Sequence, residues 1–188
     1  MPTVSLLLFV LAAAPANTAP ADPKVAIAAV LDDWHQAAAV ADEARYFGHF
    51  TADAVYLGTD ATERWTRDEF RAWARPYFAK GKAWNFKAVT RHISLSRDGT
   101  MAWFDEALDT PNLGPSRGSG VLVNEAGTWK IAQYSLSVPI PNDVLPDVKW
   151  RIERYLGRGK KKPSTMTSPP PRVPAAETPP TQPPLPTK

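Results

Sequence analysis

The spacing of apolar residues changes at Trp84, and this change limits the possible folds more than any other feature. Before it, apolar residues recur every three or four positions, as at Ile27, Leu31 and Trp34, so residues 24–41 are predicted to be a helix. After it, the spacing of apolar residues is two, which is typical of strands. Four strands are predicted, over residues 84–95, 100–108, 117–124 and 128–138.

Short sequences rich in glycine separate these strands. Residues 97–99 (Arg-Asp-Gly) and 125–127 (Glu-Ala-Gly) are typical of tight hairpin turns, so the strands that they join are predicted to be antiparallel. Helices followed by an antiparallel meander indicate an α+β fold, with helices packed on one face of a curved sheet.

Four shorter elements complete the predicted fold. A second helix is expected over residues 43–50, a short strand over 54–58, and a helix that begins after Thr66. Thr66 and Glu69 have the spacing of a capping box, and Pro76 is expected to kink or end that helix. A last helix is predicted over residues 143–156, with Val148, Ile152 and Tyr155 facing inward.

The two ends of the chain have compositions unlike the body. Residues 1–21 contain an apolar run too short to span a bilayer, followed by Ala-x-Ala sites, and are interpreted as a signal peptide without a basic start. The protein is therefore expected to be secreted or periplasmic; a retained anchor or a buried N-terminal strand is the alternative. The body is assigned to residues 22–142.

The C-terminal residues 157–188 hold ten of the twenty prolines and no aromatic residue, which predicts a disordered, proline-rich tail. This tail has six basic residues and one acidic residue, whereas residues 24–156 have sixteen and seventeen. The basic balance of the chain therefore belongs to the tail and does not indicate nucleic-acid binding. The tail is interpreted as a solvated linker; weak contact with anionic lipid headgroups, envelope polymers or a proline-recognising partner is the alternative.

The sequence has no cysteine and only three histidines, without the spacing of metal ligands. Disulfides, thiolate nucleophiles and zinc–thiolate sites are therefore excluded, and no metal or cofactor is predicted.

Aromatic and ionisable residues alternate along the body, which is typical of a concave pocket for a small molecule. Strand alternation puts Asp105 and Glu106 on opposite faces, so only one of them faces the interior. Asp105 is predicted inside because it shares a face with Trp103; the opposite facing would bring in Glu106. The pocket is predicted to contain Tyr56, Asp60, Trp65, Trp84, Trp103, Glu106, Ser119 and Gln133.

Three residues are candidates for catalysis in that pocket. A carboxylate beside indoles is partly desolvated, so Asp105 could act as a base, with His92 as proton relay and Arg117 as anion holder. The alternatives are a structural Asp105–Arg117 ion pair and an ordinary half-buried His92. His35 and His49 are expected to face solvent or cap neighbouring groups.

The order of elements, with Trp65, residues 102–106, residues 117–120 and the Trp-Lys-Ile at 129–131, resembles the SnoaL-like branch of the nuclear transport factor 2-like superfamily. The resemblance covers about residues 24–142. It implies a cone-shaped α+β barrel that binds small, largely apolar molecules and often dimerises through the outer face of its sheet.

The resemblance leaves three functions open, because fold alone does not decide function. The first is an exported dimer that binds a small, largely apolar molecule in a Trp-lined pocket. The second is an enzyme of the isomerase, cyclase or hydratase type that uses Asp105, His92 and Arg117. The third is a non-catalytic dimerisation module.

The helix over residues 24–41 lacks the Tyr that ketosteroid isomerases use there, which disfavours steroid isomerisation. Asp60, Asp105 and Arg117 supply the residue types of the epoxide hydrolase pattern without a matching motif.

Overall fold

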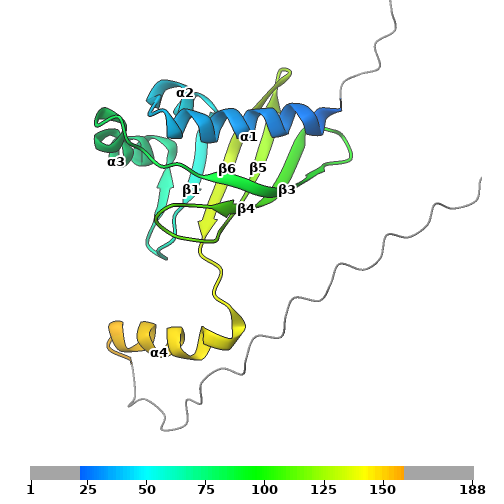
Figure 1. The fold of residues 1–188 in the computed structure, drawn as a ribbon. Coiled ribbons are helices and arrows are strands. Elements are labelled where there is room, and N and C mark those ends of the chain that lie inside the picture. The colour runs from blue at the N-terminus through cyan, green and yellow to red at the C-terminus, as the bar shows by residue number, and fades with distance from the viewer. Residues whose placement is uncertain (1–21, 159–188) are drawn as a thin grey trace, which may run out of the picture. The chain divides into compact units, whose positions relative to one another are not determined.

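The computed structural model describes residues 22–158 and shows an α+β fold (Figure 1). Its six strands form one curved, unclosed sheet in the order β2-β1-β6-β5-β4-β3. The strands are β1 (Phe50–Leu57), β2 (Arg64–Thr66), β3 (Lys87–Leu95), β4 (Met101–Asp109), β5 (Ser116–Glu125) and β6 (Thr128–Ser137). Neighbouring strands are antiparallel except β1 and β6, which are parallel. The predicted fold class and the four-strand meander are confirmed.

Three helices pack on this sheet: α1 (Pro23–Ala39), α2 (Glu43–Gly48) and α3 (Arg67–Ala79). The predicted capping box of α3 is present, with the Thr66 amide donating to Glu69 at 2.8 Å. Pro76 lies inside α3, which continues to Ala79 instead of ending at the proline. Phe50 begins β1 and does not end α2, and β2 was not predicted.

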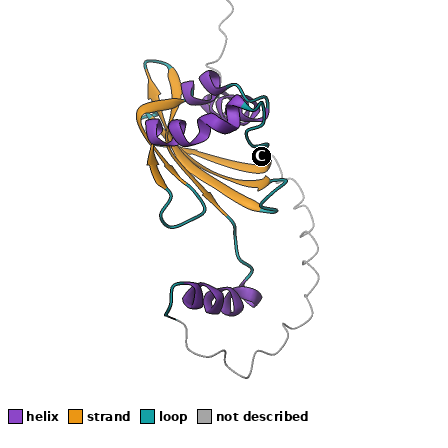
Figure 2. Cartoon of the chain, turned by 90° about the vertical axis from the view of Figure 1, so that its left-hand side faces the viewer, coloured by secondary structure: helices purple, strands orange, loops and turns teal. Residues whose placement is uncertain are grey.

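The helices all lie on one face of the sheet, which curves around them (Figure 2). Helix α1 crosses this face and packs on β3 and β6, while α3 packs on β1 and β2. The core between the two layers is aromatic. It includes Trp34 stacked on Tyr46, with ring centroids 5.1 Å apart, and Phe70 stacked on Tyr56 at 3.9 Å. The concave face of the sheet is therefore the inner face, and the other face has no helix from this unit over it.

Residues 140–158 belong to a second compact unit. They contain a short 3₁₀ helix (Asn142–Val144) and α4 (Leu145–Tyr155). Lys149 and Glu153, one helical turn apart, form an ion pair at 3.7 Å. Within this second unit no residue of α4 is buried, and the prediction that Val148, Ile152 and Tyr155 face inward stays a prediction.

The predicted signal peptide, and the proline-rich tail beyond Arg158, lie outside the described residues. Within residues 22–158, no helix is both long enough and apolar enough to cross a membrane.

Candidate functional site

The buried carboxylate of Glu106 is hydrogen-bonded to three side chains on the concave face of the sheet. Its side chain has no exposed surface. His35 Nε2 lies 2.7 Å from Oε1, and the Tyr134 hydroxyl donates to the same oxygen at 3.3 Å. Arg91 Nε donates to Oε2 at 2.8 Å. Helix α1 and strands β3, β4 and β6 thus each contribute one member of a polar cluster, which we call the Glu106 cluster.

The Glu106 cluster extends to the surface through Arg91. The guanidinium of Arg91 also donates to Asp32 at 2.8 Å and to the Ala28 carbonyl at 3.2 Å, both on α1. Arg91 therefore bridges a buried carboxylate on β4 and an exposed one on α1. Such a bridge ties the sheet to the helix, and a buried charge is tolerated because it is paired.

Burial acts to raise the pKa of Glu106, because a carboxylate loses hydration inside the protein. The hydrogen bond from His35 and the charge and hydrogen bond of Arg91 outweigh this effect, so the pKa lies below the ordinary 4.5. Burial also raises the pKa of Tyr134 well above its ordinary value, and the nearby charge of Glu106 adds to the rise. At neutral pH, Glu106 is therefore a carboxylate and Tyr134 a neutral donor.

Gly118 on β5 lies opposite Glu106 in the sheet register. A side-chain carbon at this position would overlap the Tyr134 hydroxyl and lie 2.9 Å from Glu106 Oε1. The Tyr134 and Glu106 side chains therefore approach the β5 backbone closely at this glycine. The absence of a side chain at Gly118 leaves the space in which Tyr134 reaches Glu106.

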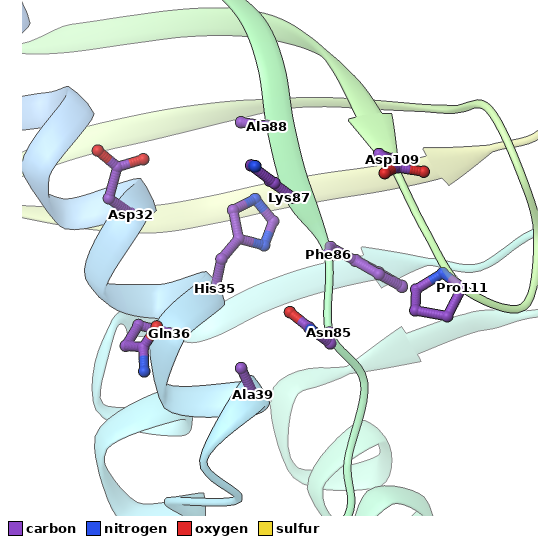
Figure 3. A pocket seen from close by; sticks show the side chains of 10 residues that line it. All are labelled: Asp32, His35, Gln36, Ala39, Asn85, Phe86, Lys87, Ala88, Asp109 and Pro111. Carbon is purple, nitrogen blue, oxygen red and sulfur yellow. The ribbon is translucent and has the colours of Figure 1, made fainter.

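Two cavities are present, and one of them is lined by His35 of the Glu106 cluster. The first, here called the polar cavity, has a volume of about 470 Å³ and lies between α1 and the start of β3 (Figure 3). Its lining consists of Asp32, His35, Gln36, Ala39, Asn85, Phe86, Lys87, Ala88, Asp109 and Pro111. The ring of His35 points from α1 toward Phe86 and Lys87 (Figure 3). The imidazole thus links the buried cluster to this cavity.

The second cavity, here called the aromatic cavity, has a volume of about 220 Å³. Its lining consists of Tyr56, Gly58, Thr59, Glu63, Trp65, Phe70, Trp73, Trp84, Phe86, Asn112, Leu113 and Leu136. Trp65 stacks on Phe70 and on Trp73, with ring centroids 5.6 and 5.3 Å apart. Trp65 reaches this wall because β2 pairs it directly with Tyr56 on β1. Phe86 lines both cavities.

The structure places the predicted site residues in three locations. Tyr56, Trp65 and Trp84 line the aromatic cavity as predicted, and Glu106 is buried beside the polar cavity. Asp60 is exposed in the turn after β1, where Thr62 donates to it. The other predicted residues lie on the outer face of the sheet: Asp105, His92, Arg117, Trp103, Ser119 and Gln133.

The prediction that Asp105 faces the interior was wrong. Asp105 and His92 pair at 3.1 Å with side chains 62% and 77% exposed, and Trp103 is 52% exposed. The face of β4 that the helices cover carries Ala102, Phe104, Glu106 and Leu108. The indole of Trp103 misled the assignment, because a large apolar side chain is not always buried. Asp105 also pairs with His92 and not, as the alternative had it, with Arg117.

Sequence reasoning missed the other three members of the Glu106 cluster, which are His35, Arg91 and Tyr134, and it missed the polar cavity. His35 was expected to face solvent, but it is 6% exposed. A usable signal existed, since His35 follows Leu31 by four positions and therefore lies on the apolar stripe of α1. Arg91 could not be placed from strict strand alternation, because the register between β3 and β4 shifts between Ala88 and Thr90. Ala88, which lines the polar cavity, and Arg91, which bonds to Glu106, therefore both lie on the inner face.

Among the described residues, no group of three or more His, Asp or Glu side chains is arranged to hold a metal. The side chains of the Glu106 cluster can form hydrogen bonds and transfer protons. An imidazole held by an ionised carboxylate at the wall of a cavity is the arrangement of an oriented base.

The sequence matches the model of the SnoaL-like domain family over residues 27–141. The chain therefore belongs to the SnoaL-like family, within the nuclear transport factor 2-like superfamily. No curated protein matches the chain in sequence.

Solved structures with the same fold differ widely in what they are named for. An NTF2-like protein of unknown function from Pseudomonas putida KT2440 has a TM-score of 0.55 and 14% identity, over 65% of this chain and 92% of that one. A candidate aromatic ring hydroxylase from Novosphingobium aromaticivorans has a TM-score of 0.54 and 16% identity, over 66% and 94%. A candidate scytalone dehydratase from the same species has a TM-score of 0.54 and 12% identity, over 63% of this chain and 85% of that one. At these identities the likeness shows the fold alone.

Proposed function

We propose that the domain binds a small, largely apolar molecule with about one aromatic ring in the aromatic cavity. The observation that carries this proposal is the wall of stacked rings formed by Trp65, Phe70 and Trp73. Such walls favour ring-shaped ligands, because aromatic pairs gain attraction beyond simple burial. A cavity of about 150 Å³ is enough for benzene. The 220 Å³ here therefore suits a single substituted ring.

Toluene is a suitable probe, because it is a single apolar ring without a hydrogen-bonding group. We expect saturation-transfer NMR to show transfer from the full-length protein to toluene. Leu113→Trp should weaken binding at least tenfold, since Leu113 lines the cavity and is 38% exposed, so a larger side chain there fills space without disturbing the core. Val89→Trp adds the same indole at a position that is 66% exposed and outside both cavities, and should bind toluene normally. Absence of transfer in the wild type, or unchanged affinity in Leu113→Trp, would contradict the proposal.

We also propose that the protein is exported and dimeric. Export rests on the apolar run and Ala-x-Ala sites within residues 1–21, and sequencing the N-terminus of protein purified from its source tests it. Dimerisation is supported by two large apolar side chains, Met101 and Trp103, that are exposed on the outer face of β4. The neighbouring strand β5 carries the small side chain of Ser119 in register with Asp105 of β4. We propose as well that residues 157–188 contact an anionic surface, and the only support for this proposal is the excess of basic residues in that segment.

An enzyme that uses Asp105, His92 and Arg117 is not proposed. These three side chains are exposed on the face opposite the helices, where the described residues form neither of the two cavities. On a single chain, a molecule bound there would lack the desolvation that the catalytic hypothesis required.

A further inference from the structure

One ring nitrogen of His35 is buried without a hydrogen-bond partner among the described residues. The residue is 6% exposed, and Nδ1 is the atom concerned. The other nitrogen, Nε2, is held 2.7 Å from Glu106. A buried polar atom without a partner is costly, so in a wall of a cavity it indicates that a ligand or water completes its bonding.

The contacts of Glu106 decide which nitrogen of neutral His35 carries the hydrogen. An ionised carboxylate only accepts hydrogen bonds, so Nε2 must donate to Oε1. Neutral imidazole has one hydrogen, and Nδ1 is therefore left with a lone pair. A ligand that satisfies Nδ1 must consequently bring a donor such as a hydroxyl group.

The rest of the polar cavity favours the same kind of ligand. Asp32 and Asp109 add acceptor oxygens, and Phe86 and Pro111 add apolar surface. Phe86 already packs against the His35 ring, with centroids 6.3 Å apart, and offers a surface on which another ring can stack. The volume of about 470 Å³ lies within the range of sites for small molecules.

We propose that the polar cavity binds a hydroxylated aromatic molecule of the phenol class, and that His35 is the acceptor and base for its hydroxyl group. Phenols suit a neutral imidazole because their hydroxyl is acidic, with a pKa of about 10 in tyrosine. In the limiting step the ligand O–H bond breaks and an Nδ1–H bond forms. The electron pair stays on the phenolate oxygen, and the imidazolium is stabilised by Glu106. This inference does not depend on toluene binding in the aromatic cavity.

Glu106 acts here as a positioning residue, because it fixes the hydrogen of His35 on Nε2 and does not itself line the polar cavity. Lys87 lines the same cavity and points from β3 toward α1 (Figure 3). Its charge would favour the phenolate form of the ligand.

The test is ¹⁵N NMR of the full-length protein with labelled histidine, at neutral pH. Only three histidines occur, so His35→Gln identifies the His35 signals. In the free protein, Nδ1 of His35 should give the signal of a ring nitrogen without hydrogen. Millimolar phenol should move this signal toward that of a protonated nitrogen, and p-chlorophenol and p-cyanophenol should move it progressively further as the acidity of the phenol increases. Toluene should leave it in place.

Two variants separate the proposal from a purely structural role. Glu106→Gln should give a mixture of the two His35 tautomers, because an amide both donates and accepts. His92→Gln, on the outer face, should leave the His35 signals and their response to phenol unchanged. The proposal is overturned if Nδ1 carries the hydrogen in the free protein, if none of the three phenols moves its signal, or if toluene moves it as much as phenol does.

Discussion

His35 and Glu106 lie 71 positions apart in the sequence, yet His35 Nε2 and Glu106 Oε1 are 2.7 Å apart in the core. Helix α1 carries the imidazole and β4 the carboxylate, so the contact exists only when the helix lies across the concave face of the sheet. The neighbouring carboxylate, Asp105, points to the opposite side of the same strand. This pair of adjacent acids offers a direct test of which face is buried.

Glu106→Ala should destabilise the domain strongly, whereas Asp105→Ala should not. Removing Glu106 leaves the Arg91 charge, with a side chain that is 10% exposed, without its buried partner. Breaking a buried ion pair in this way costs about 3–5 kcal/mol, while an exposed position changes the free energy of unfolding by about 0.5 kcal/mol or less. Urea denaturation of the two variants measures both. If the two variants lost the same stability, the assignment of Glu106 to the buried face of β4 and Asp105 to the exposed face would be wrong.

Gly118→Ala should also reduce stability, by about 1–3 kcal/mol, because the added carbon forces Tyr134 and Glu106 apart. Gly48→Ala is the matched control. A side-chain carbon at Gly48 meets no atom within 4 Å, so the change should be neutral or stabilising by less than about 1 kcal/mol. Denaturation curves of both proteins provide the comparison; a Gly118→Ala protein as stable as wild type would contradict the close approach.

Acid should weaken a second ion cluster, in which Arg45 and His49 both bond to Asp33. The hydrogen bond from Arg45, together with that from His49, lowers the pKa of Asp33 from its ordinary 3.8 to about 2, against the opposing effect of burial. Because the folded-state pKa is the lower one, this contribution to stability is present above about pH 4 and is lost as the pH falls toward 2.

Asp33→Asn should therefore cost stability at pH 5 and cost less at pH 2. The Asp33 side chain is 43% exposed, so the loss at pH 5 should be that of an exposed pair, about 0.2–1 kcal/mol. Thermal unfolding of both proteins across this range measures the difference. A penalty that is independent of pH would mean that the carboxylate is not selectively stabilised in the fold.

Trp103→Glu should convert the proposed dimer into a monomer, because it puts a charge on the exposed outer face of the sheet. Light scattering at micromolar concentration gives the mass of each species. Val25→Glu, at a position on α1 that is 66% exposed, should leave the mass unchanged. A wild-type monomer under these conditions would refute dimerisation.

The spacing of apolar residues and the turn sequences were enough to predict the α+β class, the four-strand meander and the capped start of α3. These features depend on neighbours within a few residues, where period two or four and a Thr-x-x-Glu pattern have direct physical meaning. Tyr56, Trp65 and Trp84 could also be placed near a pocket, because large aromatic side chains next to turns and strand ends are suited to lining one.

Which face of β4 is inside could not be decided locally, because Trp103 and Phe104 give both faces a large aromatic side chain. Only the packing of α1 and α3 on one side of the sheet buries Glu106 and leaves Asp105 in water. The same packing brings His35, Arg91 and Tyr134 to a common carboxylate. The sequence by itself therefore determined the elements and their order, while the tertiary structure decided the polar site, since the desolvation that makes these charges pair arises only when the layers close together.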